Sequence, residues 1–363
     1  MKTWNVGIVG LRRGRGFVSV FGAHPRVNVT ALCDIDQNTV ADLGEAFSLP
    51  DSALYTDYDQ FLGADHDIIM IATPIRFHAD QTVSALEAGR HVLCEQTAAY
   101  TVDDCERIVD AVTQTGRTYM MAENYCYFHY IRQWRDIINQ GKLGTIFHAE
   151  AEYIHEIEHL LIDEESGTYF WRHERPPIWY CAHCLGPLLT LMDDRIDEAS
   201  GSSAGFHKRP EQSDHLGFLD MEIGLFRTEK GALIKIARSQ VAPRYPHLVW
   251  YSLYGTNGYV ENGRGDGTEG HIWTEDDAGP DGPRSAEKMH CATVDPDAPE
   301  EAKHGGHGTS EYYMIREFLD ALEAEQRPPI DVMRSMDFTV PGIIAHESAM
   351  SDGNWRDVPQ FNW

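Results

Sequence analysis

The strongest candidate for a chemical site lies near the N-terminus, where a glycine turn is followed by an acid. An apolar run, Asn5–Val9, leads into a loop with glycines at Gly10, Gly14 and Gly16, and a second β-rich run ends on Asp34 at close to the expected spacing of about 20 residues. Glycines let the backbone approach a pyrophosphate, a helix N-terminus offers free N–H groups, and the acid accepts hydrogen bonds from ribose hydroxyls. This order is typical of a dinucleotide-binding βαβ unit.

The glycine pattern is incomplete. A strict G-x-G-x-x-G would need glycine where the chain has Arg12 and Arg15. An ordinary strand–turn–helix is therefore the alternative for the loop alone, and Asp34 favours nucleotide binding. Because Asp34 would repel a 2′-phosphate and Ile35 is not the arginine of many NADP enzymes, the pattern favours NAD, although Arg12 and Arg13 could reach a phosphate.

Two further motifs point to metal or redox chemistry, and both are rejected. Residues 155–159 read H-E-I-E-H, but the H-E-x-x-H zinc site needs a helix, where residues i and i+4 share a face. The preceding residues alternate like a strand, in which such positions lie roughly 13 Å apart. Cys181 and Cys184 form a single C-x-x-C without a second pair. We predict no metal site.

Alternating elements must position the glycine turn. Strand-like runs alternate with helix-compatible stretches up to about residue 123, which predicts a parallel sheet covered on both faces. The expected nucleotide-binding Rossmann domain is therefore 1–123. The strands are expected at Val27–Cys33, Tyr55–Leu62 (with a short helix), His66–Ala72, His91–Cys94 and Thr118–Ala122, and the helices at Phe17–Ala23, Asn38–Phe47, Phe77–Ala88 and Thr101–Gln114.

Residues 124–363 differ in pattern. Several runs alternate with period two, which predicts an α+β domain with a mostly antiparallel sheet. Residues 263–308 are rich in Gly, Asp, Pro and His and are expected to form a long loop or insertion. The strands are expected at Phe147–Ile154, Gly217–Phe226, Ala232–Val241 and Val249–Gly255, and the helices at Tyr130–Asn139, after His183 and at Ser310–Ala324.

Composition limits the class of partner. The 363 residues suffice for two domains, and their net charge of −27 argues against nucleic acid or an anionic membrane. No apolar run has the length of a membrane span, and the N-terminus lacks a signal-peptide pattern. The seven scattered cysteines are typical of reduced, buried thiols. We therefore expect a cytoplasmic protein that handles a neutral small molecule.

Linked motifs identify a family resemblance. Thr73, Pro74 and His78 form TP-x-x-x-H, and residues 85–95 read AL-x-AG-x-HVLCE. With the opening βαβ unit and the antiparallel second half, this resembles the Gfo/Idh/MocA family of NAD(P)-dependent sugar and cyclitol oxidoreductases. A second set of matches resembles its NAD-dependent α-N-acetylgalactosaminidase branch, whose members hydrolyse a glycoside while keeping NAD bound; that set comprises Glu123–Tyr127, Tyr153–His155, Trp171-Arg172, Tyr180–Pro187 and Gly306–Gly308.

The resemblance implies roles for individual residues. The cofactor would be contacted by Gly10, Leu11, Arg12, Gly14, Asp34, Thr73, Ile75, Arg76, His78, Glu95, Gln96 and Asn124. The sugar would be faced by Tyr153, Arg172, Tyr180, His183 and Tyr245. It also implies a homo-oligomer, a dimer or tetramer formed through the sheet, and a glycine-rich loop at His307 that closes over the active site.

Two departures from the family pattern bear on the reaction. Gln96 stands where family dehydrogenases carry a lysine that helps to move the hydroxyl proton, and glutamine does not titrate. Trp179 stands where they commonly carry an aspartate. The remaining catalytic candidates are Tyr180 and His183, with His183 suited to act as a base because the ordinary histidine pKa is about 6.5. A buried structural histidine and an aromatic wall are the alternatives for these two positions.

Arg172 could bind an oxygen of the substrate or form a salt bridge, and Tyr153 could contact the sugar or serve as a strand aromatic. Taken together, the residues favour NAD-dependent chemistry on a ring hydroxyl of a sugar or glycoside, with glycoside cleavage by transient C3 oxidation and elimination as the preferred form. One alternative is an ordinary sugar or cyclitol dehydrogenase that releases NADH. Another is a non-catalytic NAD-binding sensor.

Overall fold

A computed structural model describes residues 2–277, 282 and 285–361. The chain divides into two compact units. The first comprises Met1–Phe128 and Thr293–Met336, and the second comprises His129–Ala292 and Asp337–Gln360. The domain limits expected from the sequence, 1–123 and 124–363, stay a prediction, because the compact units group the chain by packing and return a late segment to the first unit.

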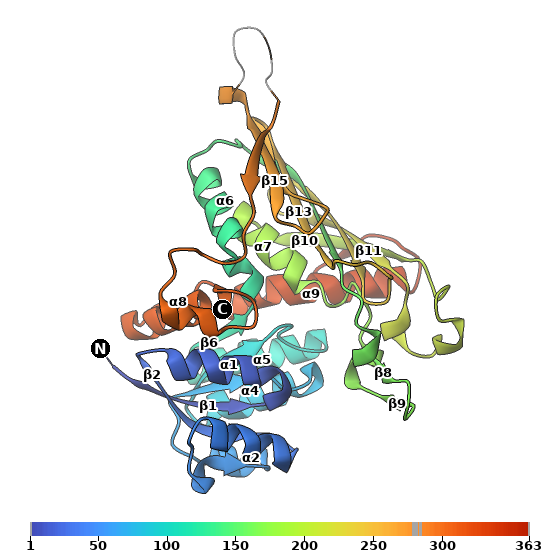
Figure 1. The fold of residues 1–363 in the computed structure, drawn as a ribbon. Helices are drawn as coiled ribbons and strands as arrows, with labels where there is room; N and C mark the ends of the chain where they lie inside the picture. Colours follow the sequence, from blue (N-terminus) through green and yellow to red (C-terminus); the bar gives the residue numbers. More distant parts are fainter. Residues whose placement is uncertain (1, 278–281, 283–284, 362–363) are drawn as a thin grey trace. The chain divides into compact units, whose positions relative to one another are not determined.

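The first unit is built on a six-stranded parallel sheet with the order β3-β2-β1-β4-β5-β6 (Figure 1). The chain steps in one direction from β1 to β3 and in the other from β4 to β6, so the sheet has a topological switch point between β1 and β4. Its strands are β1 Trp4–Val9, β2 Val27–Cys33, β3 Leu54–Tyr55, β4 Ile68–Ile71, β5 His91–Glu95 and β6 Tyr119–Ala122.

Helices connect these strands by right-handed crossovers, which put the helices before and after the switch point on opposite faces of the sheet. Helix α5 shows how the sequence fixes a boundary, because the hydroxyl of Thr101 accepts a hydrogen bond from the Asp104 backbone amide at 3.1 Å. The helices are α1 Leu11–Ala23, α2 Gln37–Ala46, α3 Tyr58–Leu62, α4 His78–Glu87 and α5 Val102–Thr115.

A late segment completes the first unit. Helix α8 (Ser310–Ala324) packs against α1 and against the short 3₁₀-helix η3 (Asn124–Tyr127). The Met121 amide donates to the Ile330 carbonyl at 3.2 Å, which ties the segment to the end of β6. The segment between Thr293 and α8 includes the 3₁₀-helix η9 (Glu300–His304), which also lies against α1.

The second unit contains a nine-stranded sheet with the order β16-β15-β14-β13-β7-β12-β11-β10-β17. Only β7 and β12 pair in parallel among these strands, so the expected mostly antiparallel sheet is confirmed. Its strands are β7 Ile146–Ile154, β10 Ile196–Ser203, β11 Glu222–Thr228, β12 Leu233–Ser239, β13 Leu248–Gly255, β14 Gly258–Asn262, β15 Glu269–Thr274, β16 Glu287–His290 and β17 Arg356–Asp357.

The expectation of a long loop over 263–308 is wrong in part. Strands β15 and β16 form a hairpin that extends the sheet beyond β14 (Figure 1). Glycine and aspartate mask the alternation there, while ladder hydrogen bonds to β14 hold the strand in the sheet. Residues 278–281 and 283–284 of this stretch lie outside the described residues.

The remaining helices are α6 (His129–Asn139), α7 (Ala182–Met192) and α9 (Val332–Ala349), and strands β8 (Ile162–Asp163) and β9 (Thr168–Tyr169) form a separate two-stranded antiparallel sheet. Helix α9 approaches the start of α7 closely: a Cβ on Gly342 would lie 2.5 Å from the Cys181 sulfur and 2.8 Å from the Trp179 carbonyl oxygen. Only glycine allows this approach, which supports the segment before α7.

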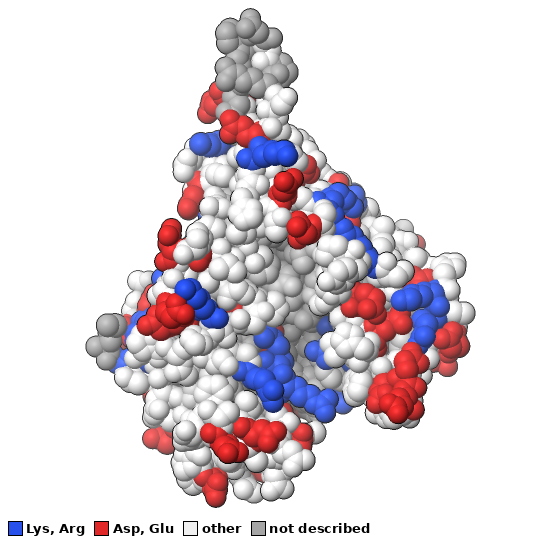
Figure 2. Space-filling view, viewed as in Figure 1, with Lys and Arg blue, Asp and Glu red and all other residues white. Residues whose placement is uncertain are grey.

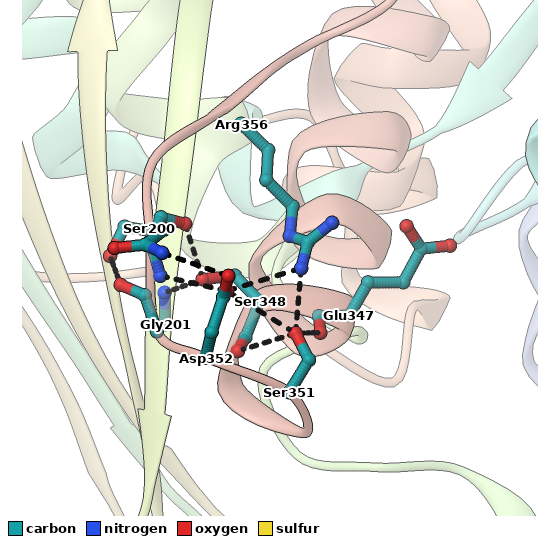
Figure 3. A network of polar contacts seen from close by, with 9 residues as sticks. Ser200, Gly201, Glu347, Ser348, Ser351, Asp352 and Arg356 are labelled. Atoms are coloured by element: carbon teal, nitrogen blue, oxygen red, sulfur yellow. Dashed lines mark hydrogen bonds and ion pairs between the residues drawn. The ribbon is translucent and has the colours of Figure 1, made fainter.

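The end of α9 is fixed by a polar network (Figure 3). The Ser348 hydroxyl accepts from the Gly201 amide of β10 at 3.1 Å and donates to the Asn354 carbonyl at 2.7 Å. The Arg356 guanidinium donates to Ser351 at 2.6 Å and to Asp352 at 3.2 Å. These bonds hold α9 and the C-terminal strand against β10. Within the part of the chain that the structure describes, no helix is long and apolar enough to cross a membrane.

Candidate functional site

The glycine turn of the first unit forms as the sequence predicts, but it is shorter. Gly10 has a φ of 87°, and a Cβ there would lie 2.5 Å from the Ala72 carbonyl carbon and the Thr73 nitrogen. Helix α1 begins at Leu11, so Gly14 and Gly16 lie inside the helix rather than in the loop, which corrects the expectation. The N-cap residue Gly10 contributes no capping side chain, and a helix N-terminus of this kind favours an anion.

Asp34 stands directly after β2 and supports the turn. Its carboxylate accepts hydrogen bonds from the amide of Leu11 at 2.6 Å and from the amide of Asp36 at 3.0 Å. The side chain therefore holds the first residue of α1 beside the end of β2. A carboxylate in this position is where a ribose hydroxyl of a dinucleotide would donate.

Basic side chains gather at the start of α1. The helix carries Arg12, Arg13 and Arg15, and Figure 2 shows Lys and Arg side chains clustered where Figure 1 draws α1. Arg12 and Arg15 are exposed, whereas Arg13 points to two carboxylates: its Nε lies 2.6 Å from Oε1 of Glu95 and its Nη2 lies 3.5 Å from Oε1 of Glu311. In a chain of net charge −27, this cluster provides local positive charge.

Glu311, which the sequence analysis did not single out, is the centre of a buried network. Its carboxylate lies 2.8 Å from Nδ1 of His307 and accepts a hydrogen bond from the side-chain amide of Asn124 at 3.4 Å. Burial opposes ionisation, but the hydrogen bond and charge of His307 and the charge of Arg13 lower the pKa of Glu311. The network joins the glycine-rich loop, α1 and the residue after β6 in one ionised cluster.

The other predicted cofactor residues lie at the ends of β4, β5 and β6. The Thr73 hydroxyl donates to the side-chain oxygen of Gln81 at 2.6 Å, and the backbone N–H of Gln96 donates to the Glu95 carboxylate at 3.0 Å. His78 is fully buried, and its two ring nitrogens lie 2.8 Å from the Thr97 carbonyl and 2.9 Å from the Thr73 carbonyl, so the ring joins the ends of β4 and β5. Ile75 is buried in the 3₁₀-helix Ile75–Phe77, and Arg76 lies over Phe77.

Glu123, the first residue of the matched Glu123–Tyr127 motif, is a second buried acid of this region. It is fully buried directly after β6, and one carboxyl oxygen accepts from the Tyr125 amide at 3.1 Å. Burial raises the pKa of Glu123 well above its usual range. The first unit thus holds an ionised acid, Glu311, and an acid that favours the protonated form, Glu123, on either side of Asn124.

In the second unit, the predicted substrate residues form a chain of rings. The His183 ring lies edge-on to Tyr180, with ring centroids 5.6 Å apart, and edge-on to Tyr153, with centroids 5.4 Å apart. His183 occupies the first turn of α7 and is 7% exposed, and its carbonyl accepts a hydrogen bond from the Tyr251 hydroxyl. Tyr153 is in β7. The structure therefore brings Tyr153, Tyr180 and His183 together, and their contact with a sugar stays a prediction.

His155 extends this chain. Its Nδ1 lies 2.7 Å from the Tyr153 hydroxyl, and its ring lies 4.1 Å from the His247 ring. Burial, followed by the positive charges of His247, Arg238, His183 and Arg175, lowers the pKa of His155 to about 3. His155 is therefore a neutral imidazole near neutral pH. Strand β7 ends one residue before it, and a 3₁₀-helix begins at Glu158, so the H-E-I-E-H segment forms neither the expected strand nor an α-helix.

Two buried arginines lie behind the tyrosines. Arg175 is 2% exposed, and its guanidinium carbon lies 3.7 Å from the Tyr180 ring centroid. Arg238 is 1% exposed, and its guanidinium carbon lies 4.2 Å from the Tyr153 centroid and 5.6 Å from the Tyr180 centroid. Burial is the main influence that lowers the pKa of Arg175, to about 9, so this side chain stays protonated at neutral pH.

The remaining predicted residues of the second unit are placed less tightly. Arg172 is half-buried in the 3₁₀-helix Trp171–Glu174 and lies over the Trp171 ring at 4.5 Å. Tyr245 is 91% exposed and touches the chain of rings only through His247, at a centroid distance of 6.0 Å. Trp179 is buried before α7. Tyr245 is thus not packed against the other predicted sugar residues.

The sequence analysis did not single out several of these residues. Arg238 carried a usable signal, because it interrupts the buried face of a strand whose neighbours alternate as LIKIARS. Arg175 belongs to the charged WRHER run, where nothing in the spacing distinguishes it from Arg172. Glu311 opens a helix and resembles an ordinary first-turn acid, so only the folded contacts reveal it.

Comparison with known proteins agrees with this arrangement. Residues 4–123 match the oxidoreductase family with an NAD-binding Rossmann fold, Gfo/Idh/MocA, and residues 204–363 match the C-terminal domain of glycosyl hydrolase 109. Among solved structures, an oxidoreductase domain protein from Kribbella flavida has a TM-score of 0.83 at 21% identity and covers 99% of this chain and 100% of its own. Levoglucosan dehydrogenase in complex with NADH and L-sorbose has a TM-score of 0.83 at 18% identity, with the same coverage.

Curated relatives span the whole chain. A glycosyl hydrolase family 109 protein of Shewanella pealeana is 29% identical over 99% of this chain and 86% of its own length. An α-N-acetylgalactosaminidase of Shewanella oneidensis is 29% identical over 99% of this chain and 85% of its own length. The two matched domains, in the order that the fold shows, identify a Gfo/Idh/MocA oxidoreductase domain with an NAD-binding Rossmann fold, followed by a glycosyl hydrolase 109 C-terminal domain.

Proposed function

We propose that the protein cleaves a glycoside by oxidising a ring hydroxyl transiently and returning the electrons within the same turnover, so that NAD is recycled. The observation that carries this proposal is the pair Tyr180 and His183, which lie edge to edge while Gln96 replaces the lysine of simple dehydrogenases. The first substrate to test is an α-glycoside of N-acetylgalactosamine, because one relative is named for the cleavage of that bond.

The first unit carries residues that fit NAD. The N-terminus of α1, the left-handed Gly10 and the acid Asp34 fit a pyrophosphate and a ribose. We assign Gly10, Leu11, Arg12, Gly14, Asp34, Thr73, Ile75, Arg76, His78, Glu95, Gln96 and Asn124 to this role. When bound, NAD accepts a hydride from the carbinol carbon of the sugar and later returns it.

His183 and Tyr180 supply the proton transfers. Oxidation of the C3 hydroxyl to a ketone releases the hydroxyl proton to solvent, which returns it when the ketone is reduced again. The ketone makes the proton on C2 acidic, and His183 removes that C2 proton as a base. The C2–H electron pair becomes the C1–C2 double bond, the C1–O bond breaks, and the leaving oxygen takes the hydroxyl proton of Tyr180. Water then adds to C1 with the reverse proton movements. Tyr153, Arg172 and Tyr245 are proposed to bind the sugar.

Product analysis tests this proposal. Purified protein is incubated with nitrophenyl glycosides, first the α-N-acetylgalactosaminide, while nitrophenol and NADH are followed separately. We expect nitrophenol without net NADH, and deuterium at C2 of the product when the reaction runs in heavy water. Net NADH with an intact glycosidic bond would instead identify a sugar or cyclitol dehydrogenase. Tight NAD binding without turnover of any sugar would identify a sensor.

Two further expectations remain proposals. We infer a homo-oligomer, a dimer or tetramer, and a cytoplasmic location. Light scattering of the purified full chain measures the first, and fractionation of the source cells measures the second. A monomer at assay concentration, or activity recovered outside the cytoplasm, would contradict them.

A further inference from the structure

Arg175 has an unusual set of partners for a buried charge. Its Nη2 donates to Oε1 of Gln240 at 2.6 Å, and the face of its guanidinium lies on the Tyr180 ring at 3.7 Å. The Nε–H is buried without a hydrogen-bond partner among the described residues. Gln240 in turn donates to the carbonyls of Arg175 at 2.8 Å and Gly217 at 2.7 Å, which fixes the amide and hence the guanidinium.

The cation has no countercharge. Neither Arg175 nor Arg238 forms an ion pair with a carboxylate of residues 2–277, 282 or 285–361, and Arg238 donates only to the carbonyls of Tyr153, Tyr180 and Ser239. After burial, the strongest electrostatic influence on the pKa of Arg175 is Tyr180, which raises it, and the cations Arg238 and Arg172 follow and lower it. Taking an unpaired cation out of water is unfavourable, so this arrangement favours negative charge at the groups that it faces.

Tyr180 is the group that Arg175 faces, and it is the proposed proton donor. A cation over an aromatic face is attracted by the ring electrons, and the attraction increases when a phenol becomes a phenolate with a full negative charge. The segment that carries Tyr180 is held in place, because the Ile178 amide donates to the buried carboxylate of Glu222 at 2.9 Å and Gly342 of α9 lies against Cys181. These contacts fix the backbone on both sides of Tyr180.

We propose that Arg175 is a positioning residue that stabilises the negative charge on the Tyr180 oxygen while this hydroxyl protonates the leaving group. The proposal rests on the proposed glycoside cleavage. The O–H bond of Tyr180 breaks as an O–H bond forms on the leaving oxygen, and the electron pair of the broken O–H bond stays on the phenolate. Water that adds to C1 gives its proton back to this phenolate, so Tyr180 and Arg175 end the turnover unchanged.

The same geometry assigns a role to Gln240. A carboxylate in its place would pair with Arg175 and cancel the charge that acts on Tyr180. The neutral amide holds the guanidinium without neutralising it. Gln240 therefore leaves the positive charge of Arg175 free to act on Tyr180. The conservative change Gln240→Glu should neutralise this charge while the arginine stays in place.

Leaving-group dependence tests the proposal, because a good leaving group needs little protonation and a poor one needs much. Wild type, R175Q, R175K and Q240E are compared on a nitrophenyl and on a methyl glycoside of the same sugar, with kcat and KM measured separately. For R175Q we expect kcat on the methyl glycoside to fall on the order of tenfold to thirtyfold, and on the nitrophenyl glycoside by less than about threefold. R175K should recover most of the loss, and Q240E should resemble R175Q.

The outcomes separate the two levels of the argument. If R175Q and Q240E lose the same factor on both glycosides, or lose nothing, Arg175 has only a structural role and the inference is overturned while glycoside cleavage stands. If wild type cleaves neither glycoside, both the proposed function and this inference are wrong. Thermal melting and NAD binding report whether R175Q folds. If it does not, R175K and Q240E are compared with wild type instead, and a loss of the same factor on both glycosides again overturns the inference.

Discussion

The two units treat buried charge in opposite ways. In the first unit, Arg13 lies 2.6 Å from Glu95 and 3.5 Å from Glu311, and Arg26 lies 2.7 Å from Asp320. In the second unit, the more deeply buried Arg175 contacts an amide oxygen and aromatic faces. The first arrangement balances charge within the fold, and the second leaves a positive excess beside two tyrosines.

This difference follows from what each unit is proposed to do. A cofactor that stays bound needs a rigid site, and paired charges give rigidity without a net field at the nicotinamide ribose. An acid catalyst becomes an anion when it gives up its proton. A cation that already lies beside it, without a carboxylate partner, stabilises that anion as it forms. Breaking a buried pair usually costs about 3–5 kcal/mol because it leaves one charge uncompensated, whereas removing an ion that has no partner leaves no such charge behind. The comparison can therefore be tested by substitution.

The largest expected effect is at His183. Replacing His183 with alanine should lower kcat for glycoside cleavage by about 10²- to 10⁴-fold, because the base for the C2 proton is lost. The affinity for NAD, measured by calorimetry, should stay within about twofold of wild type. A variant that keeps more than a tenth of wild-type kcat would show that another group acts as the base and that the chain of rings has been assigned wrongly.

A smaller effect is expected at Asp34 in the first unit. Asp34→Ala removes a charged acceptor for both the Leu11 amide and the ribose, so the Kd for NAD should rise about 10- to 100-fold. Asp36→Ala is the matched control, because Asp36 lies two residues away but caps α2, and it should cost about 1 kcal/mol of stability without changing the Kd. Equal losses of NAD affinity in the two variants would contradict the assignment of Asp34.

Unfolding experiments compare the two units directly. Glu311→Met removes a buried carboxylate that pairs with Arg13 and His307, and the thermal midpoint should fall by several degrees, corresponding to about 2–4 kcal/mol. Arg175→Met removes a cation without a carboxylate partner, and the midpoint should stay unchanged or rise. Arg26→Met, a buried arginine with an acidic partner, is the control and should destabilise. A larger loss for Arg175→Met than for Glu311→Met would overturn the comparison.

Much of the first unit could be predicted because its signals are local. The Thr101 cap is marked by residues beside it, and Asp34 follows Gly10 at the spacing that a βαβ unit requires, so spacing alone reveals them. The start of α1 was predicted too late because glycine has a low helix propensity, so Gly14 and Gly16 were assigned to the loop. In the structure, α1 packs against β1 and includes both glycines. Local pattern is sufficient where contacts are local.

Charge pairing could not be predicted in the same way. Arg13 and Glu311 are far apart in the sequence, and so are Arg175 and Gln240, so neither pairing leaves a spacing that a single sequence exposes. The return of residues 293–336 to the first unit is also non-local, because helix α8 looks the same from its own sequence wherever it packs. The resemblance located Tyr180 and His183, but it did not reveal the cation that acts on Tyr180.

The smallest expected effect concerns acid stability. Burial is the main influence that lowers the pKa of His24 and His91 to about 4, and burial and neighbouring cations lower that of His155 to about 3, whereas each titrates near 6.5 when unfolded. Between about pH 6.5 and 4, the unfolded chain binds more protons than the folded chain, so stability is full above pH 6.5 and decreases as the pH falls toward 4. Both units contribute, since His155 belongs to the second.

His24→Asn tests this contribution. Asparagine preserves the acceptor for the Arg26 amide, which lies 3.2 Å from Nδ1 of His24, but it does not titrate. The thermal midpoint of this variant should therefore fall less than that of wild type between pH 7 and pH 5, by the share of one histidine. The exposed His207→Asn is the control and should follow wild type. An unchanged pH dependence in His24→Asn would mean that this histidine is protonated inside the fold, and the ion pairs of Arg26 would then have to balance one more charge.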